Sequence, residues 1–205
     1  HPRRKLPGTT RILMCGDSYV EGLHVPLDST FHRRLERTLN ARPGGRYEVI
    51  AMGVSGSGTT QEYLTYRNFG APKQPDVVAV LFILNDWADN SKSASVGTLR
   101  PFFVGSGDTL AMDSSFVNLA DFRRGVKWAP LKHWSSLFTL FARVRQELMV
   151  RLHPTAEQAG LVGNEGWYAT WNFHTPPAAD TLAAFRLTER ILARFADEVR
   201  RDGRR

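Results

Sequence analysis

An α/β fold built on a parallel sheet is the architecture that this 205-residue sequence predicts. Strand-like apolar runs occupy residues 11–15, 47–52 and 77–84, and segments with helical spacing separate them. The third run is apolar without alternation, as expected of a central parallel strand covered on both faces. This order of strands and helices favours right-handed parallel crossovers within a single domain that spans residues 1–205.

Two helices are predicted to connect these strands. The first is expected to end near Ala41, and three candidate caps precede it: Asp28, Ser29 and Thr30. Its apolar face consists of residues at helical spacing: Phe31, Leu35 and Leu39. This assignment leaves His32 on the polar, solvated side. The second helix is predicted from about Thr60 to Asn68, after a glycine-rich turn.

Beyond the third strand, the sequence predicts a small hairpin insertion at about residues 100–113. A long helix follows, with apolar residues at helical spacing: Trp134, Leu137, Phe138, Phe141, Val144, Leu148 and Leu152. An aromatic-rich loop over residues 153–177 leads to a last helix that Thr175 caps. The predicted buried face of that helix is Leu182, Phe185, Leu192, Phe195 and Val199. A crossover helix normally leads to another strand, so we expect this chain to lack the C-terminal part of its domain.

Composition and charge narrow the class of protein. The net charge of +7 is concentrated in basic clusters at both ends, which we interpret as solvated termini rather than a nucleic-acid-binding or membrane-binding surface. The longest apolar run has eight residues, against roughly 20 in a membrane-spanning helix, so no span is predicted. The single cysteine, Cys15, excludes an internal disulfide and is predicted to be a buried apolar residue. Because the chain opens at His1 without an apolar leader, we expect any targeting segment to have been removed.

Polar or glycine residues follow each of the three predicted strands. Gly16-Asp17-Ser18 follows the first strand, Gly53 the second, and Asn85 the third. The carboxyl ends of parallel strands meet at one edge of the sheet, where open α/β sheets build their sites. A serine hydroxyl, a glycine N–H and a side-chain amide are together the parts of a nucleophile with an oxyanion hole. Each signal alone also fits an ordinary turn or helix cap.

The order of these three blocks resembles the SGNH (GDSL) hydrolase family over residues from about Arg11 to Asn90. The resemblance implies a flavodoxin-like, three-layer α/β/α fold and cleavage or transfer of acyl groups from esters. It also implies that Ser18 is the catalytic nucleophile. The oxyanion hole would then consist of the backbone N–H groups of Ser18 and Gly53 and the side-chain amide of Asn85. The motif around Ser18 is not G-x-S-x-G, which disfavours the α/β-hydrolase elbow.

The sequence departs from the family pattern in three places. Ala51 stands where the family usually has an asparagine, and Ile83 where it has a glycine. The family's catalytic aspartate and histidine come from a D-x-x-H block, and no aspartate of this chain has a histidine three residues later. The internal histidines are His24, His32, His133, His153 and His174. His174, in the aromatic loop, is the most plausible substitute base, and without a base the chain alone is expected to be inactive.

The function that these residues predict is hydrolysis of carboxylic esters, including O-acyl groups on carbohydrate, by a serine esterase. The alternative is a non-catalytic domain of the same fold that binds an acylated glycan, and a basic nucleic-acid-binding module is a more distant one. No metal or organic cofactor is implied, and the expected partner is a small-molecule or carbohydrate ester rather than nucleic acid. The family resemblance favours a secreted or periplasmic location.

Overall fold

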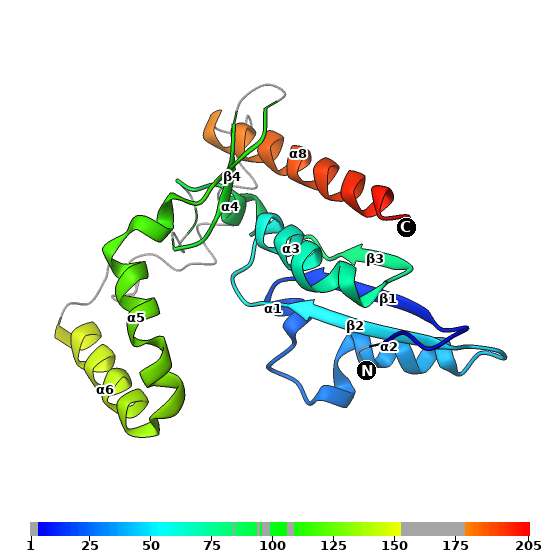
Figure 1. The fold of residues 1–205 in the computed structure, drawn as a ribbon, viewed down its shortest axis with the longest axis horizontal. Helices are drawn as coiled ribbons and strands as arrows, with labels where there is room; N and C mark the ends of the chain where they lie inside the picture. The colour runs from blue at the N-terminus through cyan, green and yellow to red at the C-terminus, as the bar shows by residue number, and fades with distance from the viewer. Residues whose placement is uncertain (1–3, 84, 94, 96–98, 106–108, 153–178) are drawn as a thin grey trace.

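A three-stranded parallel sheet forms the centre of the protein in the computed structural model (Figure 1). The structure describes residues 4–83, 85–93, 95, 99–105, 109–152 and 179–205. The strands are β1 (Thr10–Gly16), β2 (Tyr47–Gly53) and β3 (Val77–Val80), in the order β2-β1-β3. Helices cover both faces of this sheet, so the predicted α/β class with parallel strands is confirmed.

The register of the sheet brings the strand ends together. β1 pairs with β2 from Thr10↔Tyr47 to Gly16↔Gly53. On its other side, β1 pairs with β3 up to Cys15↔Val80. The segments that follow Gly16, Gly53 and β3 therefore leave the sheet at the same edge.

Alternating residues of β1 supply two cores on opposite faces of the sheet. Leu13 and Cys15 are buried against α3 (Thr59–Thr65) and α8 (Ala179–Arg201). Met14 belongs to a second buried cluster with Val20 and Val49. Leu35 of α2 (Phe31–Asn40) packs against that second cluster. The arrangement is therefore a three-layer α/β/α sandwich.

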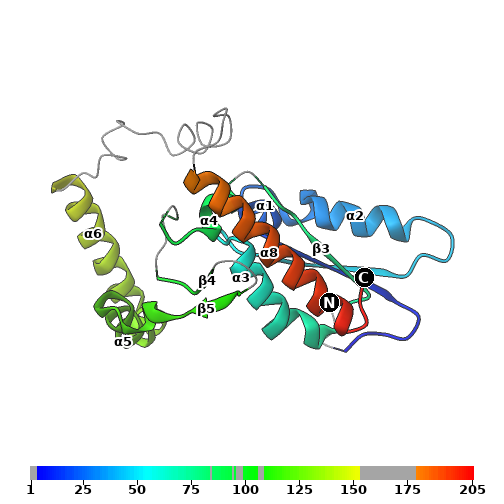
Figure 2. The same ribbon diagram turned by 90° about the horizontal axis from the view of Figure 1, so that it is seen from above.

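The remaining elements are short, except for two helices in the middle of the chain. The short helices and turns are α1 (Ser18–Glu21), η1 (Leu27–Ser29), η2 (Tyr66–Gly70), η3 (Ala71–Lys73), α4 (Asp86–Asn90) and η4 (Ser115–Asn118). Strands β4 (Phe102–Val104) and β5 (Ala111–Asp113) pair antiparallel. The long helices are α5 (Ala120–Trp134) and α6 (Ser136–Leu152), and Figures 1 and 2 show that both project away from the sheet.

The third strand differs from its prediction in length and in position. β3 ends at Val80 rather than at Leu84, which lies outside the described residues. Leu81 still donates its N–H to the Cys15 carbonyl at 2.9 Å, but the Ile83 N–H instead donates to Asp86 Oδ2 at 2.7 Å. Within the described sheet β1 is the central strand and β3 lies at the edge, so the predicted central position is wrong.

The outer edge of β3 is partly paired by the last residue of the chain. Arg205 accepts a hydrogen bond from the Val78 N–H at 2.7 Å and donates its own N–H to the Asp76 carbonyl at 3.0 Å. An apolar groove of about 620 Å³ lies beside this edge, between β3 and α8. These two hydrogen bonds of Arg205 follow the pattern of a parallel strand pair.

Predicted and observed helices differ in detail. The predicted helix from Thr60 to Asn68 is split into α3 and the short π-helix η2. Leu182 is 39% exposed, whereas the prediction placed it on the buried face of the last helix. The buried face of α8 instead includes two threonines, Thr181 and Thr188. The predicted Thr175 cap and the aromatic loop lie outside the described residues.

Candidate active site at the carboxyl edge of the sheet

Ser18 lies at the point where β1 turns into α1. Asp17, which is buried, caps this short helix through a hydrogen bond from the Tyr19 N–H to Oδ1 at 2.9 Å. The turn is tight because a Cβ on Gly16 would lie 2.3 Å from Cγ2 of Val20. Ser18 is half-buried at the first position of the helix.

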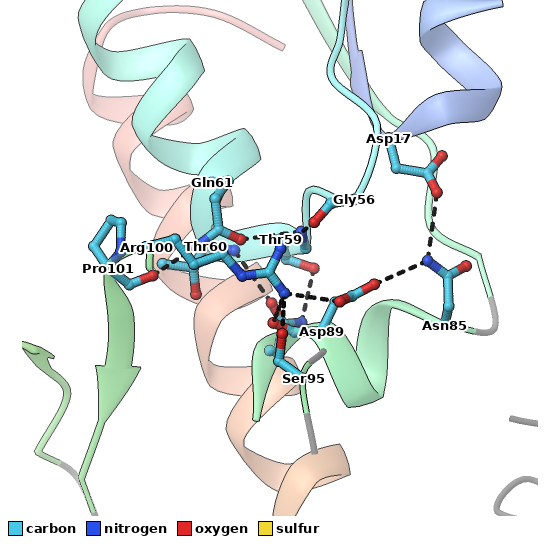
Figure 3. A network of polar contacts seen from close by, with 12 residues as sticks. Asp17, Gly56, Thr59, Thr60, Gln61, Asn85, Asp89, Ser95, Arg100 and Pro101 are labelled. Atoms are coloured by element: carbon cyan, nitrogen blue, oxygen red, sulfur yellow. Dashed lines mark hydrogen bonds and ion pairs between the residues drawn. The ribbon is translucent and has the colours of Figure 1, made fainter. Parts of the chain in front are cut away.

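One carboxylate oxygen connects the serine with the asparagine that follows β3. Asp17 Oδ2 accepts from the Ser18 hydroxyl at 3.4 Å and from the Asn85 side-chain amide at 3.4 Å. The Asn85 amide also donates to Asp89 Oδ2 at 3.0 Å (Figure 3). Both distances to Asp17 are at the long end of the hydrogen-bonding range, so these two contacts are weak.

Gly53 packs directly against the backbone of this turn. A Cβ at position 53 would lie 2.7 Å from the Asp17 carbonyl oxygen and 2.1 Å from the Glu21 nitrogen. No side chain fits there without displacement of α1. The structure therefore brings Ser18, Gly53 and Asn85, the three residues singled out from the sequence, together around Asp17.

Arg100 holds the loops on the far side of Asp89. Its guanidinium pairs with Asp89 Oδ1 at 2.7 Å and donates to Ser95 Oγ and to the Gly56 carbonyl (Figure 3). The guanidinium also lies 5.4 Å from the centre of the Phe102 ring. Arg100 thus fixes the carboxylate that in turn orients Asn85.

Asn90, at the end of α4, ties this helix to two others. Its side-chain amide donates to the hydroxyls of Thr59 and Thr188, each at 3.0 Å, and its Oδ1 accepts from the Thr60 N–H at 3.2 Å. The helix that follows Asn85 is therefore fixed against both α3 and α8. Because α4 is fixed in this way, the position of the Asn85 backbone at its start is restricted.

Two buried carboxyl groups, those of Glu62 and Asp86, interact electrostatically with Asp17. Burial raises the pKa of Glu62 to about 9, and the nearby charges of Asp86 and Asp17 act in the same direction. Burial also raises the pKa of Asp86 to about 7, although the Ile83 N–H opposes this shift. Glu62 is therefore protonated and neutral at pH 7. In the part of the chain that the structure describes, no cluster of histidine, cysteine, aspartate and glutamate could hold a metal ion.

The histidines do not complete the site within the described residues. His32 is buried rather than solvated, and its Nε2 lies 3.1 Å from the Thr30 hydroxyl. The prediction of a solvated His32 is wrong because α2 turns His32, and not Phe31, toward the interior. His24 and His133 are exposed, and His153 and His174 lie outside the described residues. No histidine in the described ranges hydrogen-bonds to Ser18.

The sequence interpretation missed the polar residues that support the site. Asp89 lies four residues after Asn85 on the helical turn, a spacing that places side chains on one face and could have indicated the pair. The contacts of Arg100 with Gly56 and Asp89 join distant parts of the chain, and no local pattern signals them. The two departures from the family pattern, Ala51 and Ile83, lie in β2 and just after β3.

No protein-family model matches the chain, and no curated protein matches it. Among solved structures it is similar to AlinE4, described as an SGNH-hydrolase family esterase, at 26% identity and a TM-score of 0.35. That match covers 40% of this chain and 44% of AlinE4. A mutant of the same esterase matches at 24% identity and a TM-score of 0.36, over 44% of this chain and 49% of the mutant. The chain therefore spans less than half the length of these structures.

Proposed function

We propose that this chain is the nucleophile-bearing part of a serine esterase that hydrolyses carboxylic esters, with O-acylated carbohydrate as one substrate class. The observation that carries the proposal is the convergence of the Ser18 hydroxyl and the Asn85 amide on one oxygen of Asp17. It occurs at the carboxyl edge of a parallel sheet, where α/β proteins bind their ligands. A hydroxyl and an amide donor are two of the parts that acyl transfer requires, and a general base is the third.

In the proposed mechanism, Ser18 Oγ attacks the ester carbonyl carbon. A histidine outside this chain, oriented by an aspartate, removes the hydroxyl proton and then returns it to the departing alcohol. The N–H groups of Ser18 and Gly53 and Nδ2 of Asn85 stabilise the tetrahedral oxyanion. Water then attacks the acyl-serine with the same histidine as base, which releases the carboxylic acid and restores the Ser18 hydroxyl.

The contacts of Asn85 are compatible with this role. Its Nδ2 carries two hydrogens, of which Asp89 accepts one in the shorter bond of 3.0 Å. The second points to Asp17 across 3.4 Å, a weak contact that an oxyanion could replace. Asp89 would therefore keep the amide oriented while its other hydrogen moved from Asp17 to the substrate.

Chemical rescue tests the proposal on this chain directly. We expect imidazole to act as the general base, so that hydrolysis of p-nitrophenyl acetate by the chain exceeds that by Ser18→Ala at the same imidazole concentration. Asn85→Ala should lower this Ser18-dependent rate by roughly 10²–10³. Ser93→Ala, which changes an exposed serine, is the matched control and should leave the rate unchanged. Equal rates for the wild-type chain and Ser18→Ala at every imidazole concentration would reject Ser18 as the nucleophile.

A second candidate function is binding of an acylated glycan without turnover. The observation in its favour is that no histidine of the described residues hydrogen-bonds to Ser18. This function predicts saturable binding of an O-acetylated oligosaccharide, measured by calorimetry, together with no imidazole-dependent turnover. Turnover in the rescue experiment would exclude it.

A further inference from the structure

Helix α6 presents a continuous apolar stripe to solvent. Six of its side chains are between 50% and 77% exposed: Leu137, Leu140, Phe141, Val144, Leu148 and Leu152. At 100° per residue, these positions lie within one arc of about 120° on the helix surface. Apolar stripes of this width normally face a protein core, so an exposed one indicates an interaction surface.

The stripe is not what attaches α6 to α5. The ring of Phe138, at the border of the stripe, stacks on Trp128 of α5 with the ring centres 6.0 Å apart. Trp134, at the junction of the two helices, is 86% exposed. Figures 1 and 2 show that both helices stand apart from the sheet and from α8. The stripe is therefore accessible without any change in the core.

The surroundings of the stripe are strongly basic. Helices α5 and α6 together contain seven Lys and Arg residues against two Asp and Glu residues, a net charge of +5. Both acidic residues pair within their own helix, Asp121 with Arg124 at 2.6 Å and Glu147 with Arg151 at 4.0 Å. Arg143 and Arg145 are exposed on α6 itself. An apolar stripe bordered by an excess of cations suits a partner that is apolar inside and anionic at its surface.

We propose that the α5–α6 hairpin binds the surface of an anionic phospholipid membrane. Helix α6 would lie in the plane of the interface, with the stripe among the upper acyl chains and the arginines at the phosphates. Trp134 would occupy the headgroup level, where tryptophan is enriched. A second copy of the chain fits less well, because stripe-to-stripe contact would bring two hairpins of charge +5 together. No described helix is long and apolar enough to cross the bilayer, so this is attachment to one leaflet.

Vesicle flotation with the full 205-residue chain tests this proposal. We expect the chain to float with vesicles of phosphatidylglycerol and phosphatidylcholine, and to remain below vesicles of phosphatidylcholine alone. Leu137→Ser with Phe141→Ser should weaken binding at least tenfold. The matched control is Leu6→Ser with Phe69→Ser, which changes exposed apolar residues elsewhere and should leave binding intact.

A second pair of variants tests the charge. Arg143→Gln with Arg145→Gln should lower the partition coefficient about 30-fold. Each cation near an anionic surface strengthens binding about fivefold, and the variant lacks two of them. Arg200→Gln with Arg201→Gln removes the same charge at the exposed end of α8 and should have little effect. Circular dichroism of each variant checks that the helices are retained.

Two results would overturn the proposal. One is equal flotation of the wild-type chain and the Leu137/Phe141 variant. The other is a dimer that the same variant abolishes, seen by analytical ultracentrifugation without any vesicle binding, which would identify a second copy as the occupant of the stripe.

Discussion

The Asn85 side-chain amide lies 3.4 Å from Asp17 Oδ2, although the two residues follow different strands of the sheet. The same oxygen accepts from the Ser18 hydroxyl, so Asp17 sets the separation between the proposed nucleophile and the proposed oxyanion donor. A carboxylate that is buried and also caps α1 has little freedom to move. The geometry of the site therefore depends on packing around Asp17.

Gly53→Ala should destabilise the protein by about 1–3 kcal/mol. The new Cβ would lie 2.1 Å from the Glu21 nitrogen and 2.5 Å from the Val20 carbonyl carbon, and backbone atoms cannot rotate away. Urea unfolding measures the change in the free energy of unfolding. Gly125→Ala is the control, because nothing lies within 4 Å of a Cβ at that position of α5, and it should stabilise by up to about 1 kcal/mol. Equal stability of the two variants would mean that Gly53 does not pack against α1.

Arg100→Gln should lower the free energy of unfolding by about 2–4 kcal/mol. The substitution leaves Asp89, whose side chain is 9% exposed, without its ion-pair partner. Urea unfolding of Arg124→Gln provides the comparison, since that arginine pairs with an exposed Asp121 and its loss should cost less than about 0.5 kcal/mol. A small effect of Arg100→Gln would show that the loops around Asp89 are held by other contacts.

Glu62→Gln should make stability less dependent on pH. The pKa of Glu62 is raised from 4.5 to about 9 in the folded protein, so folding at neutral pH takes up a proton. The stabilisation that this proton uptake gives the folded state is fully present below pH 4.5. It is lost as the pH rises toward 9, by up to about 1.4 kcal/mol per pH unit. The variant should therefore be more stable than the wild-type chain at pH 8 and similar at pH 5. Thermal unfolding across this range measures the difference.

The exposed position 189 offers a control for that experiment, because Glu189→Gln removes a solvated carboxylate and should leave the pH profile unchanged. A steep profile that persists in Glu62→Gln would point to Asp86, whose pKa is raised to about 7, as the dominant group.

Cys15 should resist thiol reagents in the folded protein. Its side chain has no exposed surface, and burial raises the pKa of the thiol to about 12, so almost no thiolate forms at pH 8. Reaction with a disulfide reagent should be immediate in concentrated urea and should otherwise follow the unfolded fraction. Rapid reaction in the absence of urea would mean that β1 opens locally without global unfolding.

The parts of the fold that the sequence predicted well are those where local patterns are unambiguous. The runs that form β1 and β2 are apolar and end at glycines, so their bounds were within about two residues of the observed ones. The edge at which Ser18, Gly53 and Asn85 meet followed from the parallel connection alone. The run at β3 was misleading, because residues 81–83 are apolar without belonging to the strand.

The errors arose where two patterns were equally good or where contacts were distant. In α2, both Phe31 and His32 share helical spacing with Leu35 and Leu39, and periodicity does not reveal the contact of His32 with the Thr30 hydroxyl. Helix α5 was not predicted, because it contains Gly125 and Pro130, two residues that usually interrupt a helix. The role of Arg100 depends on contacts across the chain, which no periodicity reveals.

The pairing of Arg205 with β3 has a practical consequence for handling the protein. Among the described residues, Arg205 alone makes backbone hydrogen bonds to the outer edge of β3. A sequence fused after Arg205 would start beside the outer edge of β3, where backbone groups lack a strand partner among the described residues. It would also lie beside the apolar face of α8 that includes Phe195 and Val199. Because an exposed strand edge recruits other chains, a tag placed there would lie beside a surface that favours association. Purification handles therefore belong at the amino terminus.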